Sequence, residues 1–242
     1  GDGDLDVLSA SLTDLRIVWY ENDGNQTFSP HTVEIRASGA RAVSAADVDS
    51  DGDMDILAAW YTDGEITWYE NDGTQTFSPH VVTDNATSAS GVLAADVDGD
   101  GDTDVVSAAA GTNTVTWHEN DGTQTFVPHN ITTGAQGVTG LFAADVDGDA
   151  DLDVLSASVS DNTIAWHEND GSGTFTTHTV TDAAAAAFDV HAGDVDGDGD
   201  IDILSASVSD NTVAWYEQVD FADLAVTMVG NPAATVIAGA RQ

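Results

Sequence analysis

Short apolar stretches alternate with polar turns along the chain. In one representative unit, apolar stretches at 91–95, 104–109, 114–119 and about 125–131 are separated by an acidic loop, a polar turn and an Asn-Asp-Gly turn. Stretches of this length bounded by Gly and Asn predict β-strands, and Asn-Asp-Gly predicts a hairpin. We find no helical periodicity in any stretch. The pattern therefore predicts four strands in each unit.

The unit recurs every 49 residues. The spacing is visible in one tryptophan, one phenylalanine and one histidine of each unit: Trp19, Trp68, Trp117, Trp166 and Trp215; Phe28, Phe77, Phe126 and Phe175; His31, His80, His129 and His178. Four strands in about 40–50 residues are typical of one blade of a β-propeller. Strands that are apolar on both sides indicate sheets buried on both faces. We predict an all-β fold, a β-propeller of about five four-stranded blades.

The repeat also divides the chain. The propeller is predicted over 1–217, with repeats 1–45, 46–94, 95–143, 144–192 and 193–217. The pattern ends after Glu217, and the C-terminal tail 218–242 has two interpretations. It is either a strand that closes the ring, within the chain or on a neighbour, or the start of a following Ig-like domain.

An acidic loop between the first and second strands carries the clearest chemistry. In Asp47–Asp55, aspartates stand at positions 1, 3, 5, 7 and 9, and Gly52 stands at position 6. Oxygen-only ligands in a short turn suit a hard divalent cation, above all calcium, and carboxylates this close repel without one. The predicted calcium ligands are Asp47, Asp49, Asp51, Asp53, Asp55, Asp96, Asp98, Asp100, Asp102, Asp104, Asp145, Asp147, Asp149, Asp151, Asp153, Asp194, Asp196, Asp198, Asp200 and Asp202, with Asp2, Asp4 and Asp6 in a truncated first copy.

The loop positions are expected to differ in role. Positions 1, 3, 5 and 9 are predicted to offer side-chain oxygens, and position 7, as in Asp53, its main-chain carbonyl. Ala150 replaces the glycine of position 6 in the fourth unit. If that position needs a positive φ, the substitution costs about 1 kcal/mol and weakens the site. The truncated first loop is expected to bind poorly unless another segment completes it.

Composition limits the partners. The chain of 242 residues has 43 acidic residues against four basic ones, a formal net charge of −39, and no cysteine. A hydrophobic content of 41% excludes a disordered acidic tail. Nucleic acids and anionic membranes need basic patches and are not expected partners. No apolar run is long enough to span a membrane, and calcium sites of this kind favour a secreted or cell-surface protein.

Several other residues are candidates for a binding site. The repeated tryptophans could stack on glycans, but a Trp in every unit favours core between blades. The repeated histidines are one blade apart and are expected to pack or cap strands. Residues that break the repeat are better candidates for a ligand patch, namely Trp60, Tyr61 and Arg16. No catalytic residues are predicted, because the chain lacks a thiol, a lysine and a nucleophile elbow; we expect it not to be an enzyme.

The Asp-x-Asp-x-Asp-Gly-x-x-Asp loop after a small apolar strand, repeated with Trp and Asn-Asp-Gly hairpins, resembles the FG-GAP/VCBS-type repeat over about 1–217. Such repeats resemble the calcium-bearing blades of integrin α-subunit propellers. The resemblance implies a calcium-stabilised extracellular propeller used in adhesion, ligand binding or scaffolding of a larger protein. One alternative is a subunit that assembles into an extracellular filament or layer through strand exchange by its tail. A second alternative is a propeller-type carbohydrate-active enzyme.

Overall fold

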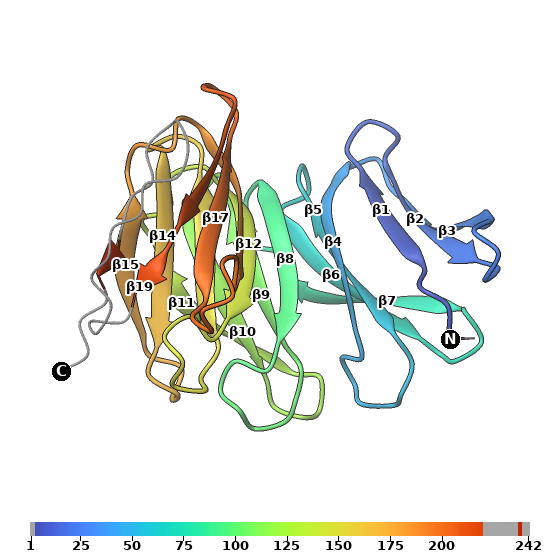
Figure 1. Ribbon diagram of the computed structural model, residues 1–242. Helices are drawn as coiled ribbons and strands as arrows, with labels where there is room; N and C mark the ends of the chain where they lie inside the picture. The colour runs from blue at the N-terminus through green and yellow to red at the C-terminus, as the bar shows by residue number, and fades with distance from the viewer. Residues whose placement is uncertain (1–2, 220–236, 239–242) are drawn as a thin grey trace.

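The computed structural model describes residues 3–219 and 237–238, and all of its regular elements are β-strands (Figure 1). The first sheet contains β1 (Val7–Ser11), β2 (Arg16–Asn22) and β3 (Phe28–Ile35). The second contains β4 (Ala40–Ala46), β5 (Asp55–Trp60), β6 (Glu65–Asn71) and β7 (Phe77–Thr83). The third contains β8 (Ala89–Ala95), β9 (Asp104–Ala109), β10 (Thr114–Asn120) and β11 (Phe126–Thr132).

The fourth sheet contains β12 (Val138–Ala144), β13 (Asp153–Ser158), β14 (Thr163–Asn169) and β15 (Phe175–Thr181). The fifth contains β16 (Ala187–Gly193), β17 (Asp202–Ser207) and β18 (Thr212–Tyr216). In all five sheets, strands adjacent in sequence pair antiparallel. A short parallel pair follows, made of β19 (Gln218–Val219) and β20 (Ile237–Ala238).

The sequence predictions for the strands agree with these elements. In the third sheet the predicted strand 104–109 is β9, and the predicted strand 114–119 ends one residue before β10 does. The all-β prediction is confirmed, and no helix is present in the described part of the chain. Each four-stranded sheet starts one strand before its acidic loop, so sheet boundaries are offset from the repeat boundaries 46–94, 95–143 and 144–192, and the division into repeats stays a prediction.

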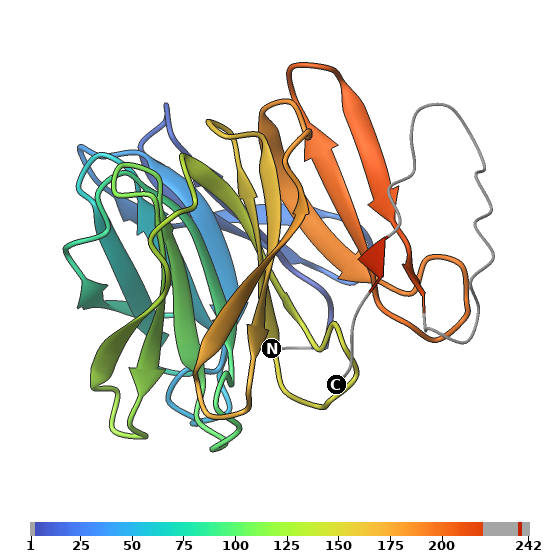
Figure 2. The same ribbon diagram turned by 90° about the vertical axis from the view of Figure 1, so that its left-hand side faces the viewer.

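The prediction of a ring of four-stranded blades holds only in part. Three of the five sheets have four strands, and the first and fifth have three each in the described residues. Within residues 3–219 and 237–238, the first sheet has no strand equivalent to β4, and the fifth has none equivalent to β15. Consecutive sheets follow one another around a curve, with β4, β8, β12 and β16 side by side on its inner side (Figures 1 and 2). The described residues do not form a closed ring.

Four hydrophobic clusters lie between the five sheets. The cluster between the second and third sheets includes Leu57, Trp68 and Val105, and the next contains Trp117. The middle strands β5, β9 and β13 are buried along their whole length, because a neighbouring sheet covers each face. Trp68 and Trp117 are 4% and 3% exposed, so they are core side chains and not a surface platform for glycans.

The C-terminal tail is described only in part. β20 pairs with β19 and therefore follows the fifth sheet. Both interpretations of 218–242, the closing strand and the Ig-like domain, concern residues that fall mainly outside the described ones. None of the described segments is a helix that is long and apolar enough to cross a membrane.

Candidate metal centres

Four acidic loops occupy equivalent places in the second to fifth sheets. Each joins the first strand of its sheet to the second, as between β4 and β5. Because the first strands run in the same direction, the loops lie together at one end of the array, the lower end in Figure 1. The Asn-Asp-Gly hairpins between third and fourth strands lie at this end too.

Three carboxylates in each loop converge. They offer oxygen atoms that all lie within 4.8 Å of one another. The clusters are Asp47, Asp49 and Asp55; Asp96, Asp98 and Asp104; Asp145, Asp147 and Asp149; Asp194, Asp196 and Asp202. Positions 1, 3 and 9 therefore converge in three loops, and positions 1, 3 and 5 in the fourth sheet. Such oxygen-only donor sets fit a hard divalent cation.

The aspartate at position 9 is fixed by two main-chain amides. Asp55 is fully buried. Its Oδ2 accepts a hydrogen bond from the Val48 N–H at 3.0 Å, and its Oδ1 accepts one from the Asn71 N–H at 2.8 Å. Asp104, Asp153 and Asp202 accept equivalent pairs of bonds. Position 9 thus joins the start of its loop to the hairpin after the third strand.

Burial of these carboxyls has an electrostatic cost. It raises the pKa of Asp55, and it raises the pKa of Asp104 and of Asp153 to about 6, even though the amide hydrogen bonds oppose the shift. Burial and the nearby charge of Asp100 also raise the pKa of Asp98 at position 3. A cation beside these groups would favour their ionised forms and offset the cost.

The turn in each loop needs left-handed backbone. At position 6, φ is +97° for Gly52, +96° for Gly101 and +100° for Gly199, and Ala150 adopts +81°. The expectation that position 6 has a positive φ is confirmed. Ala150 keeps the local hydrogen bond, because its N–H lies 3.0 Å from Asp145 Oδ2, as the Gly52 N–H lies 3.0 Å from Asp47 Oδ2.

Position 7 is placed differently. A Cβ added to Gly73 would lie 2.6 Å from Asp53 Oδ2, so this carboxylate packs against the glycine of the Asn-Asp-Gly turn. Asp102 and Asp151 pack in the same way against Gly122 and Gly171. These side chains are outside the three-carboxylate clusters. Metal binding through the position 7 carbonyl stays a prediction.

The truncated first loop is less complete. Asp2 lies outside the described residues. Asp6 occupies the place of position 9, and its Oδ1 accepts a hydrogen bond from the Asn22 N–H at 2.8 Å. Among the described residues, Asp4 and Asp6 belong to no cluster of three carboxylates.

Asparagines of two hairpins connect an acidic loop to the next sheet, a contact that the sequence did not predict. The Asn120 side-chain amide donates to the Val48 carbonyl at 3.3 Å, and that of Asn169 donates to the Val97 carbonyl at 2.7 Å. Each bond runs from one sheet to the acidic loop of the preceding sheet. The Asn-Asp-Gly signal recurs in step with the loops, but local sequence does not show that its asparagine reaches another sheet.

The repeated histidines have structural partners. His80 packs against Trp68 in a tilted arrangement with ring centroids 4.7 Å apart, and its Nε2 lies 2.8 Å from Glu70 Oε2. The equivalent contacts recur at His31, His129 and His178. This arrangement agrees with the expected packing role. The indole N–H of Trp68 is buried without completing a hydrogen bond, but it lies close enough to Asp55 to oppose the rise in that pKa.

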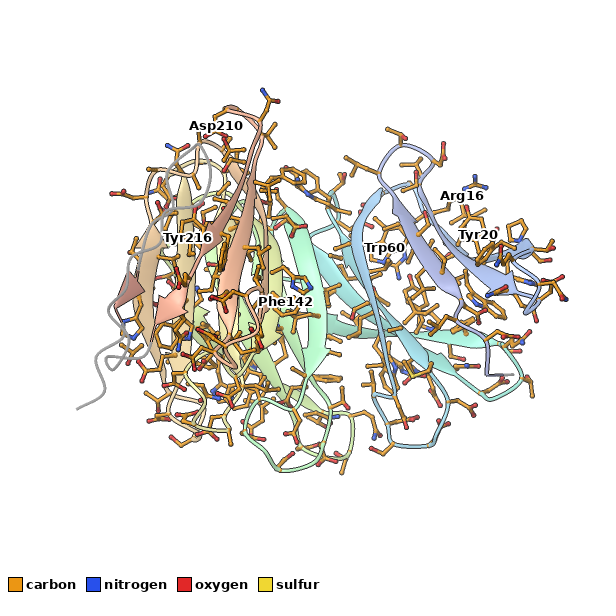
Figure 3. All side chains as sticks on the ribbon, in the orientation of Figure 1. Arg16, Tyr20, Trp60, Phe142, Asp210 and Tyr216 are labelled. Atoms are coloured by element: carbon orange, nitrogen blue, oxygen red, sulfur yellow. The ribbon has the colours of Figure 1, made fainter. Side chains whose placement is uncertain are left out.

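The three residues proposed as a ligand patch do not lie together. Trp60 is fully buried and has the guanidinium of Arg36 4.6 Å from its ring centroid, while Arg36 also pairs with Glu65. Figure 3 shows Trp60 nearer the middle of the molecule and Arg16 on the outlying first sheet. Arg16 is exposed, 3.7 Å from Asp14. Tyr61 lines a cavity.

Known structures of the same architecture exist. An Agrocybe aegerita lectin, in a structure concerned with specific recognition of non-reducing terminal N-acetylglucosamine, matches with a TM-score of 0.57 and 20% identity over 83% of this chain. A nidogen/laminin complex matches with a TM-score of 0.61 and 12% identity over 87% of this chain and 73% of the other. An auxiliary nutrient-binding protein from Bacteroides ovatus matches with a TM-score of 0.59 and 12% identity, over 88% of this chain and 56% of the other.

These identities show a shared fold and no more. The present chain spans 60% of the lectin chain. A comparison with curated proteins gives no match. A family model does match in four overlapping copies, over 1–58, 47–107, 96–156 and 145–205. The last three copies each begin at the first aspartate of an acidic loop. The chain therefore belongs to the family of FG-GAP-like repeat proteins.

Proposed function

We propose that this chain is a calcium-loaded module of β-propeller type that binds a ligand outside the cell, as part of a larger secreted or surface protein. The observation that carries the calcium assignment is the set of four three-carboxylate clusters, each with oxygen atoms within 4.8 Å. Three of them contain an aspartate that is completely buried. A buried ionised carboxylate is costly without a cation or strong hydrogen bonds.

The loop chemistry supports calcium in particular. All candidate donors are oxygens, the turn is tight, and several carboxylates act together, as in calcium loops of known type. Magnesium needs a stricter octahedral geometry and retains more water. Because sites in extracellular modules bind at 10⁻⁴–10⁻³ M, the millimolar calcium outside cells would fill them.

The test is calcium titration of protein first treated with a chelator. We expect about four bound ions and a higher melting temperature, since each site contributes about 2.7 kcal/mol when free calcium is 100 times its Kd. Terbium adds a local readout, because excitation of Trp68 and its equivalents should sensitise an ion held in the neighbouring loop. Potassium at equal ionic strength is the control.

Two results would contradict the calcium assignment. One is a melting temperature that is the same in chelator and in millimolar calcium. The other is sensitised terbium emission that does not fall when calcium is added in excess. The first result would leave the acidic loops as solvated turns, and the second would mean that calcium does not occupy the terbium site.

The propeller itself is part of the proposal. Its support is the curved array of five sheets, buried between neighbours and joined at their first strands. We propose that the ring is completed by a strand or sheet beyond the described residues. A low-resolution scattering envelope of the full protein with a central hole supports this, and an open solenoid contradicts it.

We propose binding and not catalysis as the activity. The carboxylates that recur through the chain are committed to loops, turns and the Glu–His pairs. The lectin, the nidogen/laminin complex and the nutrient-binding protein support a binding role by their fold. A net charge of −39 argues against nucleic acid as a partner. Turnover of any glycan by the purified chain would contradict this part of the proposal.

A second candidate function is self-association. It is favoured by large apolar side chains exposed in or just before the two outlying sheets, including Leu5 at 89%, before β1, and Val213 at 76%, on β18, and by the unpaired edge of β1 in the described residues. Exposed edges and apolar patches favour association. Light scattering over a wide concentration range tests it, since a mass that stays monomeric would exclude assembly.

A further inference from the structure

One position on the first strands departs from the repeat in two sheets. The equivalent residues are Arg41, Ser90, Thr139 and Phe188. Ser90 Oγ donates to the Val138 carbonyl at 2.7 Å, and Thr139 Oγ1 donates to the Phe188 carbonyl at 2.7 Å. In the third and fourth sheets, this position therefore holds neighbouring first strands together. Arg41 and Phe188 have no side-chain hydroxyl at this position, so they cannot make the same hydrogen bond between neighbouring first strands.

Arg41 and Phe188 come together instead. The Arg41 guanidinium carbon lies 5.9 Å from the ring centroid of Phe188 and 5.4 Å from that of Tyr61. Arg41 is on β4 and Phe188 on β16, so this contact joins the second and fifth sheets across the inside of the curve. Both distances are within the range of cation–π attraction. Phe188 is half-exposed, and the other two side chains are partly exposed.

Among the residues that the structure describes, the charge of Arg41 has no carboxylate partner. Arg16 lies near Asp14, and Arg36 pairs with Glu34 and Glu65. No ion pair or hydrogen bond of the Arg41 side chain is found within the described part of the chain. Stacked on aromatic rings, a guanidinium keeps its N–H donors free along its edge for a planar oxyanion.

A polar cavity lies beside Tyr61, the ring that the Arg41 guanidinium faces. It has a volume of about 270 Å³ and is lined by Tyr61, Thr62, Asp63, Gly64, Asp84, Thr87 and Ser88. It lies between the turn that follows β5 and the loop that precedes β8, at the end of the sheets away from the acidic loops. Hydroxyl and carboxylate groups around one aromatic ring offer donors and acceptors for sugar hydroxyls, together with an apolar face.

We propose that Arg41, Tyr61 and Phe188 form a binding site for an acidic sugar residue. Arg41 holds the oxyanion of the sugar through its N–H edge. Tyr61 packs against the ring, and Asp63, Thr87 and Ser88 hydrogen-bond its hydroxyls. The site is independent of the acidic loops. On a highly anionic chain, it offers an arginine that forms no ion pair among the described residues.

The test uses two acidic sugars, glucuronate and galactose 6-sulfate. They show whether the site binds a carboxylate or a sulfate as its oxyanion. The methyl ester of glucuronate is the neutral control. Affinities are measured by ligand-detected NMR titration in millimolar calcium at physiological salt, where long-range repulsion is screened. Wild type should bind at least one acidic sugar about tenfold more tightly than the ester, as loss of a charged hydrogen bond predicts.

The variants Arg41→Ser and Phe188→Thr insert residues that the chain already carries at Ser90 and Thr139, so the fold should tolerate them. Arg41→Ser should weaken binding at least about tenfold, and Phe188→Thr by a smaller factor. The matched control is Gln136→Glu, which makes the same change in net charge at the position equivalent to Thr87 in the following sheet. It should bind like wild type.

Several results would overturn the proposal. They are no binding of either acidic sugar at millimolar concentration, equal binding of the ester, an unchanged affinity in Arg41→Ser, or an equal loss in Gln136→Glu. Melting curves in calcium and in chelator, recorded on the same samples, test the metal assignment separately. The two proposals can therefore fail independently.

Discussion

The side-chain amide of Asn169 donates a hydrogen bond of 2.7 Å to the main-chain carbonyl of Val97. The two residues are 72 positions apart and belong to the fourth and third sheets. The amide also donates to the Leu152 carbonyl in its own sheet, at 3.1 Å. Val97 is position 2 of an acidic loop, so this asparagine couples the conformation of that loop to the packing of the next sheet.

Asn169→Ala should destabilise the protein and weaken calcium binding in the preceding loop. The change leaves the buried Val97 carbonyl without its donor, which costs about 1–3 kcal/mol. Urea denaturation in calcium measures the loss. Asn71→Ala is the matched control, because the Asn71 side chain donates to the Met54 carbonyl of its own sheet and no bond to a preceding loop is found in the described residues. Equal losses in the two variants would refute the coupling.

Asp98→Asn should change stability with opposite signs in chelator and in calcium. Without metal, the substitution removes one of several mutually repelling carboxylates. In the wild-type chain, Asp98 Oδ1 accepts a hydrogen bond from the Asp100 N–H at 3.3 Å, and the amide oxygen of asparagine can accept the same bond. A gain of up to about 1 kcal/mol is expected in chelator. In calcium the variant loses most of one site, about 2.7 kcal/mol at 100 times Kd. Denaturation in both conditions tests this, and a loss of similar size in both would argue against metal.

Ala150→Gly should strengthen the loop of the fourth sheet. Ala150 has a φ of +81°, where a Cβ is strained and glycine is not. We expect about 1 kcal/mol of added stability and a higher calcium affinity of this loop alone. The reverse change, Gly101→Ala in the third sheet, is the control and should cost about as much. Thermal melts and titrations of both variants show whether the backbone explains the difference between the loops.

The buried histidines predict a loss of stability in acid. Burial, with a smaller contribution from His129, lowers the pKa of His118 from 6.5 to about 4. The unfolded chain therefore takes up this proton before the folded chain does. The stabilisation is complete above the unfolded value of 6.5 and is lost as the pH falls towards 4. The loss approaches about 3 kcal/mol for this residue.

His118→Tyr isolates this contribution. Ser107 Oγ lies 2.9 Å from His118 Nε2, and in the fifth sheet Ser205 Oγ lies 3.1 Å from Tyr216 Oη, so tyrosine has a precedent at this position. The difference between wild type and variant, measured by denaturation from pH 4 to 8 in calcium, should grow in favour of the variant as the pH falls. Parallel curves would show that His118 does not titrate in this range. The carboxyl groups with raised pKa values change the stability in the opposite direction as the pH falls. Their contribution is the same in wild type and variant, so it cancels in the difference.

Much of the fold and of the candidate metal site could be predicted because both are local and repeated. The acidic loop is contiguous, so its carboxylates converge through the turn itself, with Gly52 and its equivalents at positive φ. The strands follow from short apolar runs between turns, and β9 begins and ends where the apolar run does. The 49-residue spacing then assigns the same structure to every unit.

Other features depend on which sheets meet. The sequence placed Trp60 among exposed ligand candidates, but packing between the first and second sheets buries it completely under Arg36. Arg41 meets Phe188 only because the array curves until the second and fifth sheets approach each other.

By itself, the sequence determined the strands, the turns and the carboxylates of each loop, because these depend on interactions between residues close in the chain. Tertiary structure alone decided that Asn169 reaches Val97, that Trp60 is core and that Arg41 faces aromatic rings. The physical reason is that a repeat makes residues equivalent within their own sheets, whereas contacts between sheets depend on the angle and distance at which whole sheets pack.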